Sequence, residues 1–239
     1  MEATIQKTFA ATKRQHFTLD VDFSTRSGVT VIFGPSGAGK TTILQCIAGL
    51  LAPDTGQISI DGQRVYDSAA GVEVPAQLRR VGYVFQELAL FPHMTAAQNI
   101  AFGIRMNGLE KQRLVREALE KFRIGPVGNH RPAEISGGQR QRVALARAVV
   151  TQPRLLLLDE PFTALDDELK QEIIADLKRW LAENHVPALF VTHDHEEARA
   201  LGDRVLFLRE GKIIAEATLD TGREFPKSPE LLPQSGTKN

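Results

Sequence analysis

The segment Gly34–Thr41 constrains this chain more than any other part of its sequence. It reads Gly-Pro-Ser-Gly-Ala-Gly-Lys-Thr, follows the β-branched and aromatic run Val29–Phe33, and enters a helical stretch from Lys40 to about Leu51. A glycine-rich turn between a buried strand and a helix lets backbone N–H groups surround an anion at the positive end of the helix dipole. This context argues against a glycine-rich turn that precedes a lysine by chance, and it predicts a phosphate-binding loop.

The chemistry expected of this loop is nucleotide binding. The Lys40 ammonium would reach the β- and γ-phosphates, and the Thr41 hydroxyl would bind Mg²⁺. The residues predicted to hold the nucleotide here are Gly34, Pro35, Ser36, Gly37, Ala38, Gly39, Lys40, Thr41 and Thr42.

Strand-like and helix-like segments alternate along most of the chain. Largely apolar runs at Val81–Phe85, Leu155–Leu158, Pro187–Thr192 and Arg204–Leu208 are typical of strands covered on both faces. Helical patterns separate them, and Leu165–Asn184 is the longest amphipathic one. The alternation predicts an α/β fold with a mostly parallel sheet and helices on both of its faces.

Two regions depart from that alternation. The region from Glu87 to about Val150 holds helical segments such as Leu109–Ile124, broken by Gly-Pro and Arg-Pro pairs, so we expect an inserted helical subdomain at about 87–150. From Thr221 onward the chain contains prolines and little pattern. We therefore expect 221–239 to be a C-terminal tail rather than a further domain.

The composition is that of an ordinary soluble globular protein, with 42% apolar and 24% charged residues among 239. Lys plus Arg equals Asp plus Glu at 29 each, which gives no sign of a polyanionic partner. Basic residues predominate from Arg105 to Arg147 and acidic residues from Asp159 to Glu197. We interpret these as two solvated faces rather than a nucleic-acid site, because the basic residues do not alternate with aromatic ones.

The sequence also bears on location. The single cysteine, Cys46, lies on an apolar helix face and is expected to be a structural thiol, since no internal disulfide can form. No signal pattern and no apolar run of membrane-spanning length is present. We therefore expect a cytoplasmic chain whose membrane role, if it has one, depends on a partner.

Acidic residues follow the apolar run Leu155–Leu158 directly. A carboxylate at the end of a buried strand is well placed to hold Mg²⁺, which is the role predicted for Asp159. Glu160 is then the candidate for orienting and activating the attacking water. An ordinary acidic turn after a strand is the alternative, and the phosphate loop in the same chain argues against it.

A second glycine-rich turn lies at the start of the helical pattern from Arg140 to Val150. Ser136 can cap that helix, and the following glycines leave its N-terminal N–H groups uncovered, which makes a second anion site. A simple helix cap is the alternative if the segment is considered alone. The residues predicted to contact phosphate here are Ser136, Gly137, Gly138 and Gln139.

Taken together, these motifs resemble those of the ATP-binding cassette family over nearly the whole chain. In chain order the shared features are the phosphate loop, Gln86 after a strand, Ser136-Gly-Gly-Gln139, Asp159-Glu160, Ala164-Leu165-Asp166 and His193. The resemblance implies a P-loop NTPase core with a mostly parallel sheet, an antiparallel β subdomain and the inserted helical subdomain. It also implies residues 1–220 as the nucleotide-binding domain, ATP and Mg²⁺ as cofactors, and ATP hydrolysis as the activity.

The resemblance further implies individual roles. Gln86 looks like the glutamine that contacts Mg²⁺ or water and senses the membrane partner. His193 looks like the switch histidine that contacts the γ-phosphate, although a lone histidine is more often a surface or core residue. The Ser136–Gln139 segment is similar to the signature that contacts ATP held by the other subunit. Asp166 looks like the aspartate at the dimer interface.

Two departures from the family pattern are present. Ile135 stands where leucine is usual, a swap expected to be harmless. The family stacks the adenine on an aromatic residue upstream of the phosphate loop, and no tyrosine occurs there. Phe9 is the predicted stacking residue, His16 and Phe17 are its rivals, and an ordinary apolar strand residue is the alternative for Phe9.

The family resemblance implies a head-to-tail homodimer with two ATP molecules between its subunits. Segment Phe91–Met94 is similar to those of bacterial importer subunits, so we expect it to contact integral membrane permease subunits and, through them, a solute-binding protein indirectly. The chain would then be peripheral on the inner face of the membrane and bind no nucleic acid. The stretch from Arg80 to His93 most resembles molybdate-type oxyanion importers.

Three rival classes of ATPase or nucleotide-binding protein fit the sequence less well. A soluble chromosome or DNA-repair ATPase needs long coiled coils between its phosphate loop and signature, and no sustained heptads occur here. A translation-associated ATPase is expected to carry two cassettes. A non-hydrolysing nucleotide-binding module conflicts with the presence of Lys40, Asp159, Glu160 and His193.

Overall fold

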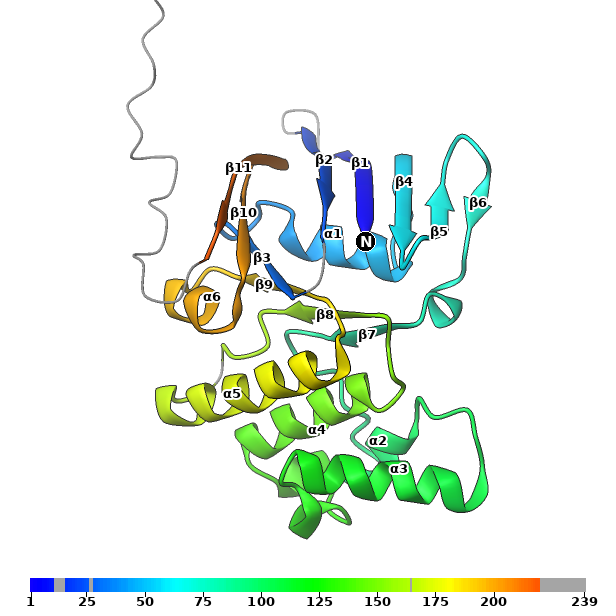
Figure 1. Cartoon of the computed structure of the whole chain (residues 1–239), viewed down its shortest axis with the longest axis vertical. Helices are drawn as coiled ribbons and strands as arrows, with labels where there is room; N and C mark the ends of the chain where they lie inside the picture. Colours follow the sequence, from blue (N-terminus) through cyan, green and yellow to red (C-terminus); the bar gives the residue numbers. More distant parts are fainter. Residues whose placement is uncertain (11–15, 26–27, 164, 220–239) are drawn as a thin grey trace, which may run out of the picture.

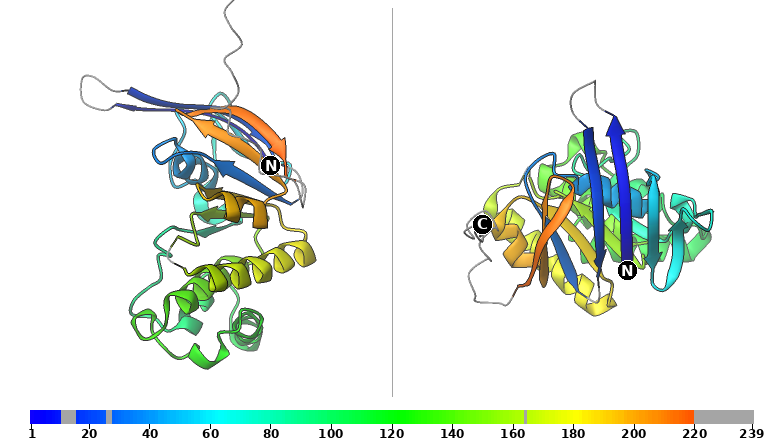
Figure 2. Two further views of the ribbon diagram at one scale, coloured as in Figure 1. Left: turned by 90° about the vertical axis from the view of Figure 1, so that its left-hand side faces the viewer. Right: turned by 90° about the horizontal axis from the view of Figure 1, so that it is seen from above.

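The computed structural model describes residues 1–10, 16–25, 28–163 and 165–219. In Figure 1 two β-sheets lie above a group of helices. Figure 2 shows the same order from the side, with an antiparallel sheet at the top and helices at the bottom. The tail expected at 221–239 lies outside the described residues.

Six strands form a mainly parallel sheet in the order β11-β10-β3-β9-β8-β7. The strands are β3 Val29–Phe33, β7 Val81–Val84, β8 Leu155–Asp159, β9 Ala188–Thr192, β10 Arg204–Arg209 and β11 Lys212–Thr218. Within the described residues, β11 alone runs antiparallel, paired with β10. Every residue of β3, β8 and β9 is buried, which explains their uninterrupted apolar sequences. The expected α/β fold is confirmed.

A second, antiparallel sheet has the order β2-β1-β4-β5-β6. Its strands are β1 Glu2–Ala10, β2 His16–Ser24, β4 Thr55–Ile60, β5 Gln63–Asp67 and β6 Val72–Glu73. Burial alternates along β1, with Ala3 and Ile5 inside and Thr4 and Gln6 outside. One face of this sheet therefore packs on the core and the other faces solvent.

Helix α1, Lys40–Ala48, lies between the two sheets. Its buried side chains, including Ile43 and Ile47, share one apolar cluster with Ile5 of β1 and Leu157 of β8. Cys46 belongs to the same cluster, and burial raises the pKa of its thiol to about 11. These surroundings agree with the structural role expected of the thiol.

Helix α1 ends before Gly49 and not near Leu51 as the sequence suggested. Gly49 has a φ of 77°, a left-handed conformation that terminates the helix. The buried guanidinium of Arg79 donates to the carbonyl oxygens of Cys46 and Ile47 at 2.8 and 3.0 Å. It thus supplies donors to carbonyls at the end of the helix, where the Cys46 oxygen also accepts from the Gly49 N–H at 3.2 Å.

The other helices are α2 Ala96–Ala101, α3 Gly108–Lys121, α4 Gly137–Val149, α5 Asp167–Asn184 and α6 His195–Leu201, with 3₁₀ turns at Ala76–Leu78, Gly125–Val127 and Pro132–Glu134. Helix α3 stops short of the expected end at Ile124, since Arg123 has a φ of 56°. Helices α2 to α4 fall within the region predicted as a helical subdomain at 87–150. That division stays a prediction.

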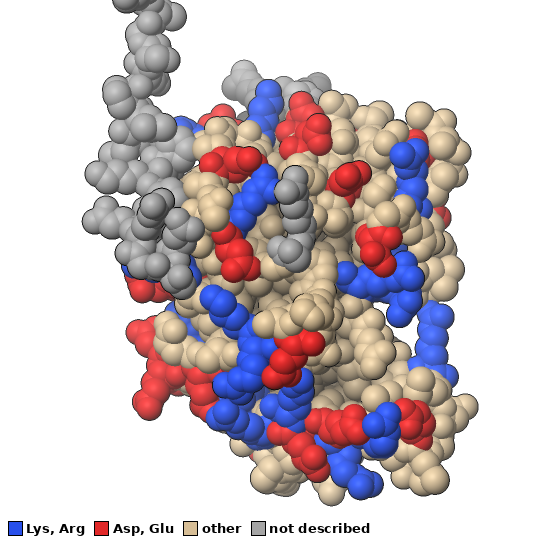
Figure 3. Space-filling model, in the orientation of Figure 1, with Lys and Arg blue, Asp and Glu red and all other residues tan. Residues whose placement is uncertain are grey.

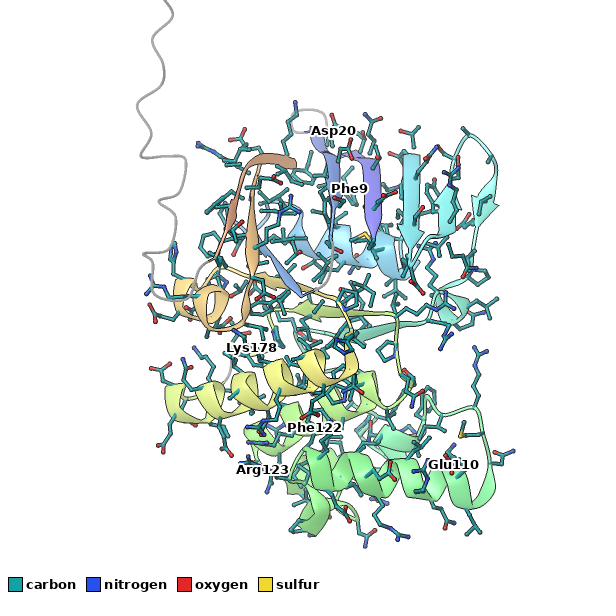
Figure 4. All side chains as sticks on the ribbon, viewed as in Figure 1. Phe9, Asp20, Glu110, Phe122, Arg123 and Lys178 are labelled. Atoms are coloured by element: carbon teal, nitrogen blue, oxygen red, sulfur yellow. The ribbon has the colours of Figure 1, made fainter. Side chains whose placement is uncertain are left out.

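Charged side chains join α4 and the loop after α3 to α5. The buried guanidinium of Arg142 contacts Asp176 at 2.9 Å and Glu172 at 3.1 Å, and Arg123, labelled in Figure 4, contacts the same two carboxylates. Figure 3 shows basic and acidic side chains side by side over these helices. The basic and acidic stretches of the sequence are therefore partly paired with each other across the helices.

No helix among the described residues has both the length and the apolar character needed to cross a membrane.

Candidate functional site

The predicted phosphate loop connects the end of β3 to the first turn of α1. Gly37 and Gly39 have φ values of 80° and 103°, which side chains rarely adopt. A Cβ atom at Gly34 would lie 2.2 Å from the carbonyl oxygen of Leu208, so the backbone of β10 passes directly against the loop. Gly39 supplies no side-chain cap, so the first N–H groups of α1 can be taken up by a phosphate.

Lys40 lies along the inside of this loop. Its ammonium donates to the carbonyl oxygens of Gly34 at 2.9 Å and Pro35 at 3.1 Å. It also lies 3.3 Å from Oε1 of Glu160, and only 5% of its side chain is exposed. The structure thus brings the predicted phosphate-binding cation and the predicted catalytic carboxylate into direct contact.

Asp159 ends β8 beside the first turn of α1. Its Oδ1 accepts a hydrogen bond from the Thr41 hydroxyl at 2.9 Å, and its Oδ2 accepts one from the Tyr83 hydroxyl at 3.1 Å. Burial raises the pKa of this carboxyl, and the two hydrogen bonds oppose the shift. Burial likewise raises the pKa of the Tyr83 phenol, so this hydroxyl stays a donor.

The donor set at Asp159 suits Mg²⁺. A carboxylate and a hydroxyl are hard oxygen ligands, and Mg²⁺ is commonly held by one or two such protein groups together with phosphate oxygens and water. The described residues contain no group of three or more His, Cys, Asp or Glu side chains that could hold a metal. The carboxylate and the hydroxyl supply two protein ligands, so this pair fits an ion that completes its coordination with phosphate oxygens and water.

Glu160 and His193 meet at the ends of the adjacent strands β8 and β9. Nδ1 of His193 lies 3.2 Å from Oε2 of Glu160, and half of the imidazole side chain is exposed. Glu160 has a φ of 42°, and its N–H donates to the carbonyl oxygen of Val191 at 3.0 Å. A left-handed conformation at a non-glycine residue is costly, and such residues cluster at functional sites.

Gln86 lies on the loop that follows β7, where its side chain is exposed. Within the described part of the chain, no side-chain hydrogen bond joins it to the Asp159 cluster. The guanidinium of Arg147, at the end of α4, donates to the carbonyl oxygens of Leu88 and Ala89 and lies 5.7 Å from the ring centroid of Phe91. Arg147 therefore fixes the loop after Gln86 to α4.

The second predicted anion site forms the N-terminus of α4. The Ser136 hydroxyl accepts from the N–H of Gln139 at 3.2 Å, and the Gln139 side chain accepts from the N–H of Ser136 at 2.9 Å. A Cβ at Gly137 would meet only Arg140, at 3.8 Å, whereas a Cβ at Gly138 would lie 2.2 Å from Leu169. The turn is therefore open at Gly137 and packed against α5 at Gly138.

The helices that begin at the two predicted anion sites, α1 and α4, pack on opposite faces of the six-stranded sheet. Alternate residues of β8 pack into different clusters: Leu155 and Leu157 with α1, Leu156 and Leu158 with α4 and α5. Figure 1 likewise shows β7 and β8 between α1 and α4. The helices that begin at these two turns therefore pack on different sides of the sheet.

Asp166 caps α5, since its Oδ1 accepts from the N–H of Leu169 at 3.0 Å. Its expected role at a dimer interface stays a prediction. Ala164, quoted with it in the sequence motif, lies outside the described residues.

The aromatic residues upstream of the loop are paired across β1 and β2. The ring centroids of Phe9 and Phe17 are 6.2 Å apart, and Figure 4 labels Phe9 on β1. A Cβ at Gly39 would lie 3.0 Å from Cζ of Phe17, so Phe17 is the ring in contact with the phosphate loop. The side chain of His16 lies outside the described residues. Adenine stacking by Phe9 stays a prediction, with Phe17 its nearer rival.

Sequence reasoning missed two residues of this site. Tyr83 donates to Asp159, and its place in an apolar strand gave no sign of that contact. Arg147 holds the loop after Gln86, and in the sequence it is one of several basic residues on an amphipathic helix.

Comparison with known families agrees with this geometry. A profile of the ABC transporter family matches residues 19–163. The chain belongs to the ABC transporter family. The resemblance of the sequence motifs to this family is confirmed, and the chain carries an ABC ATPase cassette.

Several curated proteins of this family are similar to the chain. The molybdenum import ATP-binding protein of Azotobacter vinelandii is 44% identical over 205 residues, covering 85% of this chain and 57% of the relative. The spermidine/putrescine import ATP-binding protein of Methylococcus capsulatus is 46% identical over 198 residues, covering 81% and 50%. The sulfate/thiosulfate import ATP-binding protein of Synechocystis is 44% identical over 225 residues, covering 92% and 61%. The chain spans between half and about three-fifths of the length of these relatives.

Two solved structures of one ABC cassette share the fold. A dimeric post-hydrolysis ATP-binding cassette bound to ADP and Pi superposes with a TM-score of 0.79 at 32% identity, covering 92% of this chain and 98% of that one. A dimeric bacterial ABC transporter cassette gives a TM-score of 0.80 with the same identity and coverage. The expected P-loop NTPase fold is confirmed.

Proposed function

We propose that the chain binds and hydrolyses ATP as the cytoplasmic subunit of a membrane importer. The strongest support comes from the contacts that Glu160 makes at the carboxyl ends of β8 and β9. There Glu160 lies 3.3 Å from Lys40 and 3.2 Å from His193. This places a cation for phosphate, a carboxylate for water and an imidazole within one small volume.

Each side chain has a proposed step. Thr41 and Asp159, with Gln86 from the neighbouring loop, would hold Mg²⁺, which when bound neutralises charge on the β- and γ-phosphates. Glu160 would accept the proton of the attacking water, and His193 would orient the water and the γ-phosphate from the other side. Lys40 would exchange its carbonyl partners for phosphate oxygens, which form stronger charge-assisted hydrogen bonds.

We propose a head-to-tail homodimer as the working unit. Ser136 and Gly137 present an anion site on the face of the sheet opposite the phosphate loop, so a second chain must bring its signature to each ATP. The two similar solved structures, both of one cassette, are described as dimeric, which agrees with this arrangement.

The proposed membrane contact is the surface around segment Phe91–Met94. A hollow of about 500 Å³ lies there, lined by His93, Met94 and Phe102 among others. Phe102 is 60% exposed and the nearby Met106 is 48% exposed. Exposed apolar side chains around a hollow suit an apolar segment of a permease subunit. The chain would then sit on the inner face of the membrane and meet a solute-binding protein only through the permease.

The proposed cargo is molybdate or a similar oxyanion. The relatives are named for importing molybdenum, sulfate/thiosulfate and spermidine/putrescine, so oxyanions are frequent but not uniform among them. A soluble role in DNA repair or translation is not favoured, because each of these relatives is named for import.

Purification of the tagged full chain from detergent-solubilised membranes tests the proposed function. We expect an integral membrane protein to co-purify in a fixed ratio. Phe102→Asp should abolish that association without impairing ATP hydrolysis by the chain alone, while Leu78→Asp, at an apolar position of similar exposure elsewhere, should not. Recovery of ribosomal or DNA-bound partners instead would contradict an importer.

A further inference from the structure

A cluster of polar side chains, Thr192, Asp194, Glu197 and Lys170, lies next to His193 at the first turn of α6, and most of it is buried. The Thr192 hydroxyl donates to Oε2 of Glu197 at 2.7 Å and accepts from the N–H of Asp194 at 3.0 Å. Asp194 in turn caps α6 by accepting from the N–H groups of Glu196 and Glu197. The residues on both sides of His193 are therefore tied to the first turn of α6.

Lys170, on the first turn of α5, reaches into this cluster. Its Nζ lies 3.4 Å from Oδ2 of Asp194 and 3.5 Å from Oε1 of Glu197, and also 3.4 Å from the exposed carboxylate of Asp167. The Lys170 side chain is 12% exposed and that of Glu197 is 5% exposed. A carboxylate so deeply buried is costly unless a cation pairs with it.

The cluster acts on the backbone that carries the imidazole. His193 makes its contact with Glu160 from a turn whose two flanking residues, Thr192 and Asp194, are both held by the cluster. Lys170 contacts Asp194 directly and Thr192 through Glu197. Loss of the ammonium would leave two carboxylates repelling each other beside His193 and would loosen that turn.

We propose that Lys170 is a positioning residue that holds His193 against Glu160, an inference that rests on the role proposed for His193. The Lys170 ammonium pairs with Asp167, Asp194 and Glu197, and it acts on His193 through the last two. Its effect falls on turnover more than on nucleotide binding, because the phosphate loop lies outside the cluster.

The same helix offers a matched control. Lys178, eight residues further along α5, also reaches α6, where its Nζ donates to the carbonyl oxygen of Ala200 at 3.3 Å. Figure 4 labels Lys178 on the side of α5 that faces α6. It joins the same two helices but lies away from the turn of His193, so it separates helix packing from positioning.

The experiment compares Lys170→Met, Lys170→Arg, Lys178→Met and His193→Ala in the full chain. We expect Lys170→Met to lower kcat for ATP by about tenfold or more, with KM changed by less than about threefold. Lys170→Arg should restore most of kcat, since it returns the positive charge. Lys178→Met should keep kcat near that of the parent chain, even if it lowers the thermal midpoint as much as Lys170→Met does.

Three results would overturn the inference: full kcat in Lys170→Met, an equal loss of kcat in Lys178→Met, or no recovery in Lys170→Arg. His193→Ala separates the two hypotheses. If it stays active, the role proposed for His193 fails, whereas an inactive His193→Ala beside a fully active Lys170→Met refutes only the positioning role. Should Lys170→Met fail to fold, Lys170→Gln takes its place, because it removes the charge but keeps a hydrogen-bond donor toward Asp194 and Glu197, and full kcat in it would overturn the inference.

Discussion

Asp159 is a buried carboxylate whose pKa is raised above its ordinary value of 3.8 by burial, against two opposing hydrogen bonds. Because the folded state holds its proton more tightly, this group costs stability once the pH rises above that ordinary value. Asp159→Asn removes the ionisation, so we expect a higher thermal midpoint at neutral pH together with lost Mg²⁺-dependent hydrolysis. The gain should vanish below about pH 4, where the carboxyl is protonated in both states.

Thermal melts at neutral and acidic pH, with a phosphate-release assay, check this pair of effects. Asp20→Asn is the control, because Asp20 is an exposed residue of β2 whose hydrogen bond from the Gln6 amide an Asn oxygen can also accept, so its neutralisation should leave the midpoint nearly unchanged. A lower midpoint for Asp159→Asn at neutral pH, or undiminished hydrolysis, would contradict the prediction.

Single residues also mark how far the sequence predicts the site. Spacing alone singled out Lys40, Asp159 and Glu160, since each is defined by its distance from the end of a buried strand. The Tyr83 hydroxyl could not be predicted, because its contact depends on β7 lying beside β8, a pairing between segments far apart in the sequence. The left-handed conformation of Glu160 was equally out of reach, since no glycine marks it.

At the scale of elements, the end of α1 depends on a side chain from a distant turn. Arg79 donates to three carbonyl oxygens, those of Val74, Cys46 and Ile47, and is almost fully buried. Arg79→Met removes the donors to these acceptors, of which the Cys46 carbonyl keeps a hydrogen bond from the Gly49 N–H at 3.2 Å, so we expect a loss of roughly 2–3 kcal/mol in the free energy of unfolding.

Urea denaturation measures this loss. Arg80→Met is the matched control, since Arg80 is the exposed neighbour and its substitution should change stability little. An Arg79→Met midpoint equal to that of the control would show that solvent or other groups satisfy the carbonyls.

The sequence predicts whether a segment is a helix or a strand where one hydrophobic period dominates it. It does not predict the residue at which the element ends. The apolar runs of β3, β8 and β9 are long enough to identify buried strands, and the structure matches them to within a residue or so. The ends of α1 and α3 lie earlier than the apolar pattern suggests. There the backbone conformations of Gly49 and Arg123, and not hydrophobic periodicity, decide where the helix stops.

At the scale of the whole molecule, the packing of α1 and α4 on opposite faces of the six-stranded sheet favours a dimer. Lys40 and Ser136 are both predicted to bind phosphate, yet the helices that begin at them pack against opposite faces of one six-stranded sheet. We propose that a single ATP bound at Lys40 does not contact the same chain's Ser136. Each ATP site is therefore expected to be completed by the signature of a second chain.

Complementation between two damaged chains tests this expectation. A homodimer of Lys40→Ala or of Ser136→Arg has two damaged sites, so each should hydrolyse little ATP. A mixed dimer holds one site with both lesions and one with neither, so mixing the two variants should restore hydrolysis if a single intact site can turn over. If both sites must act together, ATP-dependent crosslinking between cysteines placed at Ser36 and Gly137 gives the answer. The native Cys46 will not interfere, because it is fully buried and its pKa is raised to about 11. Crosslinks confined to single chains would refute the head-to-tail arrangement.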